Sequence, residues 1–368
     1  MPLLPSPPIT RWHRADMPVT VEEVIAPRAY GARPPLPVNQ IIVTRRQLRL
    51  QLLSLGAAIH SLEVPNASGE LRNVHLSLDH VSDYADAALN PHFGATIGRY
   101  ANRIGHSRFT LDGTEYAVDC NRPPNTLHGG TWGFDRVVWQ IAEVSSSDTS
   151  DRIVFRLHSP SGDMGFPGNL IAESTYIVDD ESVTFEYSAV TDAPTVVSFA
   201  NHGYWNLSGA PTIADHELTV SARRVLASGD DQLPTGELND VTGTPFDLRA
   251  PRRIGDVLAD VPGGLDHCWV FDDADLDVSE RAPRLRTVAH LSAGGRSMTV
   301  ATDCPGMQVY TGNALKPPFA VHQSVSLETQ RLPDAPNHPH FGPCALRPGD
   351  EYRSTTKLTF GTRTSESQ

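Results

Sequence analysis

Two segments of the chain place a histidine and a glutamate where a β-strand would normally show plain alternation. They are Ser198-Phe-Ala-Asn-His-Gly-Tyr-Trp-Asn-Leu-Ser-Gly209 and Ser326-Leu-Glu-Thr-Gln-Arg331. If the first segment is extended up to His202, then Ser198 and Ala200 share the face of that histidine. In the second segment Ser326 shares the face of Glu328. Each strand is thus expected to turn one apolar face to a core and one small, polar face to a cleft.

A histidine and a carboxylate in one cleft are suited to general acid–base chemistry. The histidine can give a proton to an acetal or hemiacetal oxygen while the carboxylate takes one from a hydroxyl, and each role is typically worth ~10²–10⁴ in rate. A site built from hydroxyl-binding groups also discriminates strongly, because an unmatched buried polar group is costly. His202 and Glu328 are therefore the predicted acid–base pair of a sugar site.

Further polar and aromatic residues cluster in three other segments. These are Gly98-Arg-Tyr-Ala-Asn-Arg-Ile-Gly105, Asn125-Thr-Leu-His-Gly-Gly130 with Trp132-Gly-Phe-Asp135 after it, and Pro305-Gly-Met-Gln-Val-Tyr-Thr-Gly-Asn313. In the last, Gln308 and Tyr310 fall on one strand face. Tyr204 or Trp205 could lie against the C–H face of a sugar, although tryptophans are more often core residues.

Composition excludes several other classes of function. The net charge of −13 argues against a nucleic-acid partner, which requires a basic stripe. The four cysteines show no metal-ligand spacing, which predicts isolated, reduced thiols. The pair His338 and His340 flanks a proline without nearby carboxylates, so we expect a surface loop, no metal and no cofactor. No apolar run approaches the ~20 residues of a membrane span and no secretory signal is evident, which favours a cytoplasmic protein.

Short alternating runs broken by Gly, Asp, Asn and Pro predict many strands joined by turns. Since strand–helix alternation is absent, the predicted fold is all-β, a large antiparallel β-sandwich. Asp112-Gly113 is typical of a hairpin turn, and Val81 to Ala88 is the best short helix candidate. Proline-rich residues 1–37 are expected to form a poorly ordered extension, residues 38–362 a single domain and 363–368 a polar tail.

In the same segments the sequence resembles the aldose 1-epimerase (galactose mutarotase) family, over residues 40 to 360. The motifs that carry the resemblance are Gly98-Arg-Tyr-Ala-Asn-Arg-Ile, Asn125-x-Leu-His-Gly-Gly, Asn201-His-Gly-Tyr-Trp-Asn-Leu-Ser-Gly, Leu265-Asp-His267, Pro305-Gly-x-Gln-x-Tyr-Thr-Gly-Asn and Leu327-Glu-Thr-Gln. The resemblance implies the β-supersandwich of that family, with an open cleft and a reaction that needs no metal. Two features depart from the pattern: Trp205 stands where many relatives have Phe, and the N-terminal extension lies outside the family core.

The resemblance also implies roles. Glu328 would remove the proton of the C1 hydroxyl and His202 would protonate the ring oxygen, so that the sugar opens, rotates about C1–C2 and recloses as the other anomer. The substrate-binding residues would be His128, Arg103, Asn102, Asp266, Gln308 and Tyr204. From the sequence alone Asp266 is better explained as a turn residue, and the resemblance reverses that interpretation.

Two alternatives to an epimerase of free aldoses such as galactose and glucose remain. An epimerase of phosphorylated hexoses would need a basic contact such as Arg103 or Arg331. A non-catalytic sugar-binding module on the same scaffold should have lost His202 or Glu328, and both are present. The expected partner is a small aldose, with neither nucleic acid nor membrane, and the chain is expected to be a monomer or homodimer.

Overall fold

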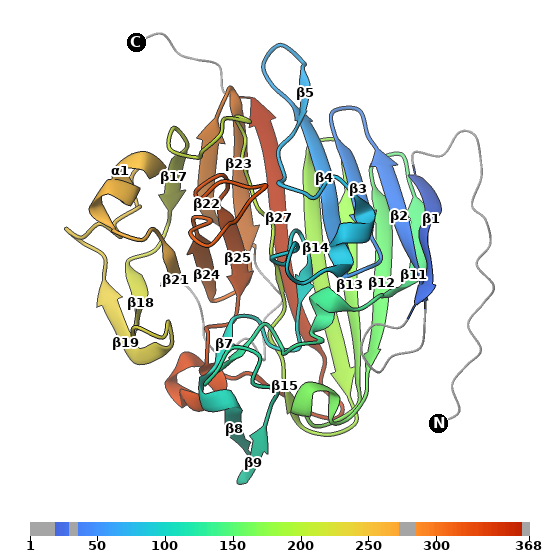
Figure 1. The fold of residues 1–368 in the computed structure, drawn as a ribbon, viewed down its shortest axis with the longest axis vertical. Helices are drawn as coiled ribbons and strands as arrows, with labels where there is room; N and C mark the ends of the chain where they lie inside the picture. Colours follow the sequence, from blue (N-terminus) through green and yellow to red (C-terminus); the bar gives the residue numbers. More distant parts are fainter. Residues whose placement is uncertain (1–18, 29–35, 272–284, 363–368) are drawn as a thin grey trace.

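The computed structural model describes residues 19–28, 36–271 and 285–362. Within them antiparallel strands dominate, which confirms the predicted fold class. Figure 1 shows the strands side by side across the molecule, with the short helix α1 (Ile254–Asp260) at one edge beside β17. No helix among the described residues is long and apolar enough to cross a membrane.

A nine-stranded sheet forms the largest layer. In spatial order its strands are β11 (Gln140–Ser146), β12 (Asp151–Ser159), β13 (Leu170–Val178), β14 (Ser182–Thr191), β27 (Tyr352–Thr362), β23 (Arg296–Thr302), β22 (Arg286–Ala293), β17 (Glu217–Val220) and β20 (Arg252–Arg253). The structure agrees with the alternation seen in the sequence, since Ile153, Phe155 and Leu157 of β12 are all buried. Burial of each such side chain typically contributes about 1.5–3 kcal/mol.

Two five-stranded sheets complete the sandwich. One runs β1 (Val19–Arg28), β2 (Leu36–Thr44), β3 (Arg49–Leu53), β4 (Ala58–Pro65) and β5 (Leu71–Asn73). The other runs β19 (Pro234–Asp240), β18 (Arg224–Ser228), β21 (Asp266–Val270), β24 (Gly306–Tyr310) and β25 (Ser326–Gln330). One hydrophobic cluster includes residues of all three large sheets, so the sheets share a core.

Short pairs and turns connect these sheets. The paired strands are β6 (Thr96–Ile97) with β16 (Ala200–Asn201), β7 (Arg103–Ile104) with β10 (Thr126–Leu127), β8 (Arg108–Leu111) with β9 (Thr114–Ala117), and β15 (Thr195–Val196) with β26 (Ala345–Leu346). The 3₁₀ turns are η1 (Val81–Ala85), η2 (Gly105–Ser107), η3 (Phe134–Arg136), η4 (Asp163–Gly165), η5 (Ala335–Asn337) and η6 (Pro339–Phe341). The helix candidate at Val81 is thus a 3₁₀ turn.

The predicted hairpin at Asp112-Gly113 is confirmed. These two residues join β8 to β9 with φ of 51° and 77°. Positive φ at both central positions is the backbone of a type I′ turn, which explains the Asp-Gly pair.

The N-terminal segment departs from the expectation of a poorly ordered extension. Val19–Arg28 forms β1 and pairs antiparallel with β2. Val19 is buried, and Val21 and Ile25 pack against the main core. The β-branched residues between the proline clusters supply this strand, and the prolines on either side obscured it in the sequence. The domain boundaries otherwise remain a prediction.

Candidate active site

His128 directly follows β10, His202 directly follows β16 and Glu328 lies in β25, and the three side chains come together from these separate sheets. The imidazole Nε2 of His202 lies 3.5 Å from Oε1 of Glu328. One nitrogen or oxygen of each of the three side chains falls within 4.8 Å of the others. Their exposed fractions are only 6 %, 5 % and 2 %, respectively. The predicted acid–base pair is therefore a buried pair, with His128 beside it.

Strand register places Glu328. It is the central residue of β25 and lies opposite Gln308 of β24, as the alternation of the two segments predicts. The intervening Leu327 and Val309 are buried in the main core. The apolar residues therefore fix which face of each strand carries the carboxylate and the amide.

A tight turn places His128, which directly follows β10. Its backbone φ is +53°, and its Nδ1 accepts a hydrogen bond from the backbone N–H of Asn102 at 3.2 Å. The next residue, Gly129, has φ of +82°, and a Cβ there would meet the carbonyl oxygen of Gly98 at 2.1 Å. Glycine is therefore required at this turn. Because Nδ1 accepts, the proton of the neutral ring is on Nε2.

Aromatic rings pack against His202. Tyr204 stacks on its ring at 4.9 Å between ring centroids and His92 at 5.6 Å, while His128 meets the ring edge-on at 5.2 Å. The hydroxyl of Tyr204 donates to the carbonyl of Pro91 at 2.8 Å. Tyr204 thus orients the predicted acid through its ring, and its predicted contact with sugar stays a prediction.

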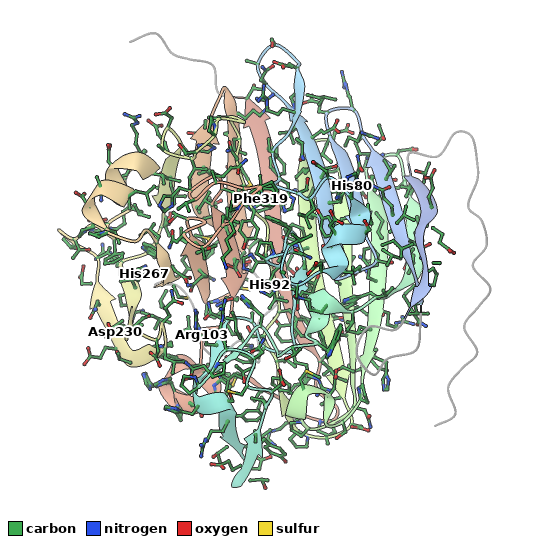
Figure 2. The ribbon with its side chains drawn as sticks, viewed as in Figure 1. His80, His92, Arg103, Asp230, His267 and Phe319 are labelled. Atoms are coloured by element: carbon green, nitrogen blue, oxygen red, sulfur yellow. The ribbon has the colours of Figure 1, made fainter. Side chains whose placement is uncertain are left out.

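His92 belongs to the site although no motif pointed to it (Figure 2). Its Nδ1 lies 2.7 Å from Oδ2 of Asp135, and the same carboxylate pairs with Nε of Arg136 at 2.9 Å. Asp135 is buried, whereas the side chain of His92 is 21 % exposed. Asp135 ends a segment that stood out in the sequence, but His92 sits in an irregular loop without periodicity.

The predicted sugar-binding side chains form a hydrogen-bonded row. Nη1 of Arg103 donates to Oδ1 of Asn102 at 3.3 Å, and Nε2 of Gln308 donates to Oδ1 of Asp266 at 2.7 Å. Gln232, from the turn between β18 and β19, hydrogen-bonds to both Arg103 and Asp266 and so joins these two pairs into one row. Asp266 opens strand β21, so it is not the turn residue that the sequence alone suggested. Gln232 lies in no motif, and nothing in its surroundings in the sequence marks it.

Trp205 lies in the core. It is 2 % exposed and packs against His75 and Phe360, with ring centroids at 5.4 and 6.2 Å. The tryptophan therefore acts as a core residue and not as a platform for a sugar.

Burial sets the charge state of the pair in the empty site. Burial, and after it the charge of His92, lower the pKa of His202 to about 3. Burial, and after it the charge of Asp266, raise the pKa of Glu328 well above its usual value, with Arg103 opposing them. Burial likewise lowers the pKa of His128 well below its usual value. Burial thus favours the neutral imidazoles of His202 and His128 and the protonated carboxyl of Glu328.

Two imidazoles and a carboxylate at this spacing are also a set that could hold a metal ion. Among the described residues this is the one such cluster of at least three potential ligands. A metal on His202 would occupy the nitrogen that faces Glu328. The same atoms therefore serve either as metal ligands or as proton carriers, and cannot do both at once.

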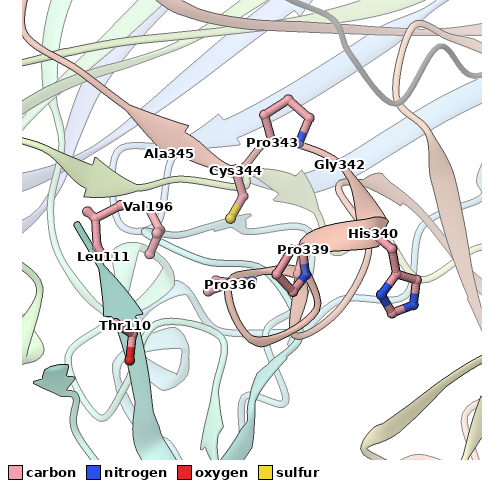
Figure 3. A pocket seen from close by; sticks show the side chains of 11 residues that line it. Thr110, Leu111, Val196, Pro336, Pro339, His340, Gly342, Pro343, Cys344 and Ala345 are labelled. Carbon is pink, nitrogen blue, oxygen red and sulfur yellow. The ribbon is translucent and has the colours of Figure 1, made fainter. Parts of the chain in front are cut away.

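A separate surface pocket contains none of the predicted site residues (Figure 3). Thr110, Leu111, Val196 and a proline-rich segment from Ala335 to Ala345 line it. Burial raises the pKa of Cys344, which points into it, to about 11. A thiol kept protonated in this way is unreactive, so we assign the chemistry to the His202–Glu328 pair.

An antiparallel β-sandwich with a buried histidine–glutamate contact beside a row of hydrogen-bonding side chains is the arrangement expected of a carbohydrate-active enzyme. The family model for aldose 1-epimerase matches residues 40–359. The galactose mutarotases of Bos taurus and Homo sapiens are both 38 % identical, over 85 % of this chain and 91 % of theirs. The aldose 1-epimerase of Escherichia coli (strain K12) is 36 % identical over 84 % of this chain and 91 % of its own. The chain therefore belongs to the aldose 1-epimerase family, and it is a carbohydrate isomerase.

Solved structures agree on the fold. An aldose epimerase homologue from C. elegans superposes with a TM-score of 0.78 at 27 % identity, over 88 % of this chain and 98 % of that one. Galactose 1-epimerase from Lactobacillus acidophilus NCFM gives 0.81 at 24 % identity, over 95 % and 100 %. The large antiparallel sandwich is thus the mutarotase fold.

Proposed function

We propose that this protein interconverts the α and β anomers of free aldohexoses such as galactose and glucose through acid–base ring opening. The observation that carries the proposal is the buried contact between Nε2 of His202 and Oε1 of Glu328 at 3.5 Å. Glu328 lies opposite Gln308 on the neighbouring strand, and Gln308 donates to Asp266 in the row that also contains Arg103. The printed names of the relatives, galactose mutarotase and aldose 1-epimerase, support the same substrate class.

Ring opening needs one proton removed and one supplied. Glu328 takes the proton of the C1 hydroxyl, the C1–O1 bond becomes a carbonyl, and the bond from C1 to the ring oxygen breaks. The ring oxygen then takes a proton from His202. After rotation about C1–C2, the C5 hydroxyl attacks the other face of the carbonyl, returns its proton to His202, and O1 recovers a proton from Glu328.

The directions of the two pKa shifts fit one half of this cycle. Protonated Glu328 with neutral His202 is the state that follows opening and the one that recloses the ring. Opening begins from the same pair after one proton has moved from Glu328 to His202 across their contact. Both states hold a single proton, so the pair alternates between them without exchange with bulk water.

The remaining expectations concern the setting of the enzyme. We expect the enzyme to need no metal ion and to work in the cytoplasm. We also expect a monomer or homodimer, with neither nucleic acid nor membrane as a partner. One chain supplies every residue of the proposed site, which supports a subunit that works alone. Size-exclusion chromatography with light scattering would give the oligomeric state.

The contacts of Arg331 favour the free sugar over a phosphorylated one. Its guanidinium lies 5.5 Å from the ring centroid of Tyr352 and donates to the carbonyl of Pro343. It is thus engaged away from the row of hydroxyl-binding groups.

Polarimetry of freshly dissolved α-D-galactose and α-D-glucose tests the proposal. The protein should speed equilibration, and Glu328→Gln and His202→Asn should each lose at least about 10²-fold in kcat/KM. Equilibration no faster than in buffer would refute the activity. Variants as fast as the parent would refute the roles assigned to the two residues.

A further inference from the structure

Gln232 closes the row of sugar-binding side chains in the empty site. Its Oε1 accepts a hydrogen bond from Nη2 of Arg103, and its Nε2 donates to Oδ2 of Asp266 at 2.8 Å. Asp266 receives the Gln308 amide on its other oxygen at 2.7 Å. One side chain from a surface turn therefore occupies both an arginine donor and a carboxylate acceptor.

The carboxamide offers the same hydrogen-bonding groups as a sugar. An acceptor for the arginine and a donor for the carboxylate are what one hydroxyl, or two neighbouring hydroxyls, would supply. Hydrogen bonds to charged groups are among the stronger ones in proteins. A sugar hydroxyl that binds the same Nη2 donor and Oδ2 acceptor must therefore take the place of the amide.

The position of Gln232 suits a side chain that moves aside. It lies on an exposed turn between β18 and β19, closed by backbone hydrogen bonds between Gly229 and residues 232 and 233. Its own φ is +61°, a conformation that L residues rarely adopt. Neither Glu328 nor His202 contacts its amide in the described structure, so the amide can leave without disturbing the acid–base pair.

We propose that the Gln232 amide occupies the position of a sugar hydroxyl between Arg103 and Asp266 and is displaced by the substrate, so that it sets how tightly the enzyme binds an aldose. This rests on the proposed function. When the competent state is only partly populated, the apparent dissociation constant is the intrinsic one divided by the open fraction. If the amide fills the site about four-fifths of the time, its removal strengthens sugar binding about fivefold.

The test compares Gln232→Gly and Gln232→Asn with the parent enzyme. Glycine suits the positive φ and removes the amide, whereas asparagine tolerates the φ but is one methylene shorter, too short to keep both bonds. We expect KM for galactose, and the dissociation constant measured by calorimetry, to fall about fivefold in Gln232→Gly and less in Gln232→Asn. The value of kcat should not change.

A matched control lies in the same turn. Asp230 is exposed and is labelled near the turn in Figure 2, so Asp230→Ala should leave KM at the parental value. An unchanged KM in Gln232→Gly would overturn the proposal. A higher KM would overturn it too, because Gln232 would then be a substrate contact. The parent enzyme is assayed before any variant is made. If the parent equilibrates no aldose, the proposed function fails, and this outcome is distinct from a failure of the Gln232 proposal.

Discussion

His202 owes its properties to the rings around it. Tyr204 and His92 both stack on its ring, and the interior location favours the neutral imidazole. His92 is in turn fixed by Asp135, whose pKa stays below its usual value because His92 and Arg136 outweigh the effect of burial. Burial is the main cause of the low pKa of His202, and His92, a residue outside the family motifs, lowers that pKa further.

Replacement of His92 by Phe should raise the pKa of His202. Phenylalanine preserves a ring near His202 but removes the contact with Asp135 and the electrostatic effect of His92, which lowers the pKa of His202. The limb of the pH profile that reports protonated His202 should therefore move to higher pH, as measured by kcat/KM against pH. The profile of Ser82→Ala, a variant on an exposed turn, provides the control. An unaltered profile in His92→Phe would show that His92 does not tune the acid.

Glu328→Gln should produce an inactive protein that is more stable than the parent. The pKa of Glu328 is raised in the folded state, so folding favours its protonated form. The stability that this carboxyl contributes is full below the unfolded value of about 4.5 and declines as the pH rises toward the folded pKa. The variant should therefore melt higher at pH 7, by about 2–4 °C for each kcal/mol of relief, and equally at pH 4. If the parent instead melts at a higher temperature than Glu328→Gln at pH 7, the pKa of Glu328 is not raised in the folded state.

Added metal ions should inhibit the equilibration of galactose and should not accelerate it. If no metal is required, prolonged dialysis against EDTA leaves kcat unchanged. Added Zn²⁺ should bind His128, His202 and Glu328, which lie close enough to share it, and should compete with galactose. Loss of activity in EDTA that Zn²⁺ restores would instead establish a metal-dependent enzyme.

At the scale of elements, regular strands were predictable and irregular turns were not. Alternation placed Glu328 with Gln308 on one face, because the side-chain period of a strand leaves two choices and the apolar residues select one. Arg103 and Asp266 were predicted from the family resemblance, because no alternation in the sequence identifies them. Gln232 and His92 lie in turns, where position depends on tertiary contacts that no local pattern carries.

The turn after β10 provides a test of how local geometry supports the site. Gly129→Ala should destabilise the fold by about 1–3 kcal/mol and lower activity, since the added Cβ meets the Gly98 carbonyl and displaces His128. Gly113→Ala is the matched control, because its φ is a similar +77° but no atom lies within 4 Å of the added Cβ. Urea denaturation of both variants separates the cost of the clash from that of the backbone conformation. Equal losses of stability would mean that the turn absorbs the clash.

At the scale of the whole molecule, the proposed active site and the N-terminal edge strand β1 lie on different sheets. The acid–base pair and the hydroxyl-binding row draw on the sheet of β24 and β25 and on the turns beside it. The N-terminal strand β1 belongs to another sheet, where it covers the edge of β2. Loss of that strand should therefore affect stability and leave the rate of the reaction intact.

Removal of residues 1–28 tests this separation. The deletion exposes the backbone edge of β2 and the packing site of Val19, so the melting temperature should fall and aggregation should increase. The kcat of freshly prepared protein should match that of the full chain, because no residue of the acid–base pair contacts β1. Deletion of residues 1–18 alone, which leaves β1 in place, is the control and should melt like the parent. If the longer deletion lowers kcat while the melting temperature is maintained, the N-terminal segment takes part in the site, and the separation fails.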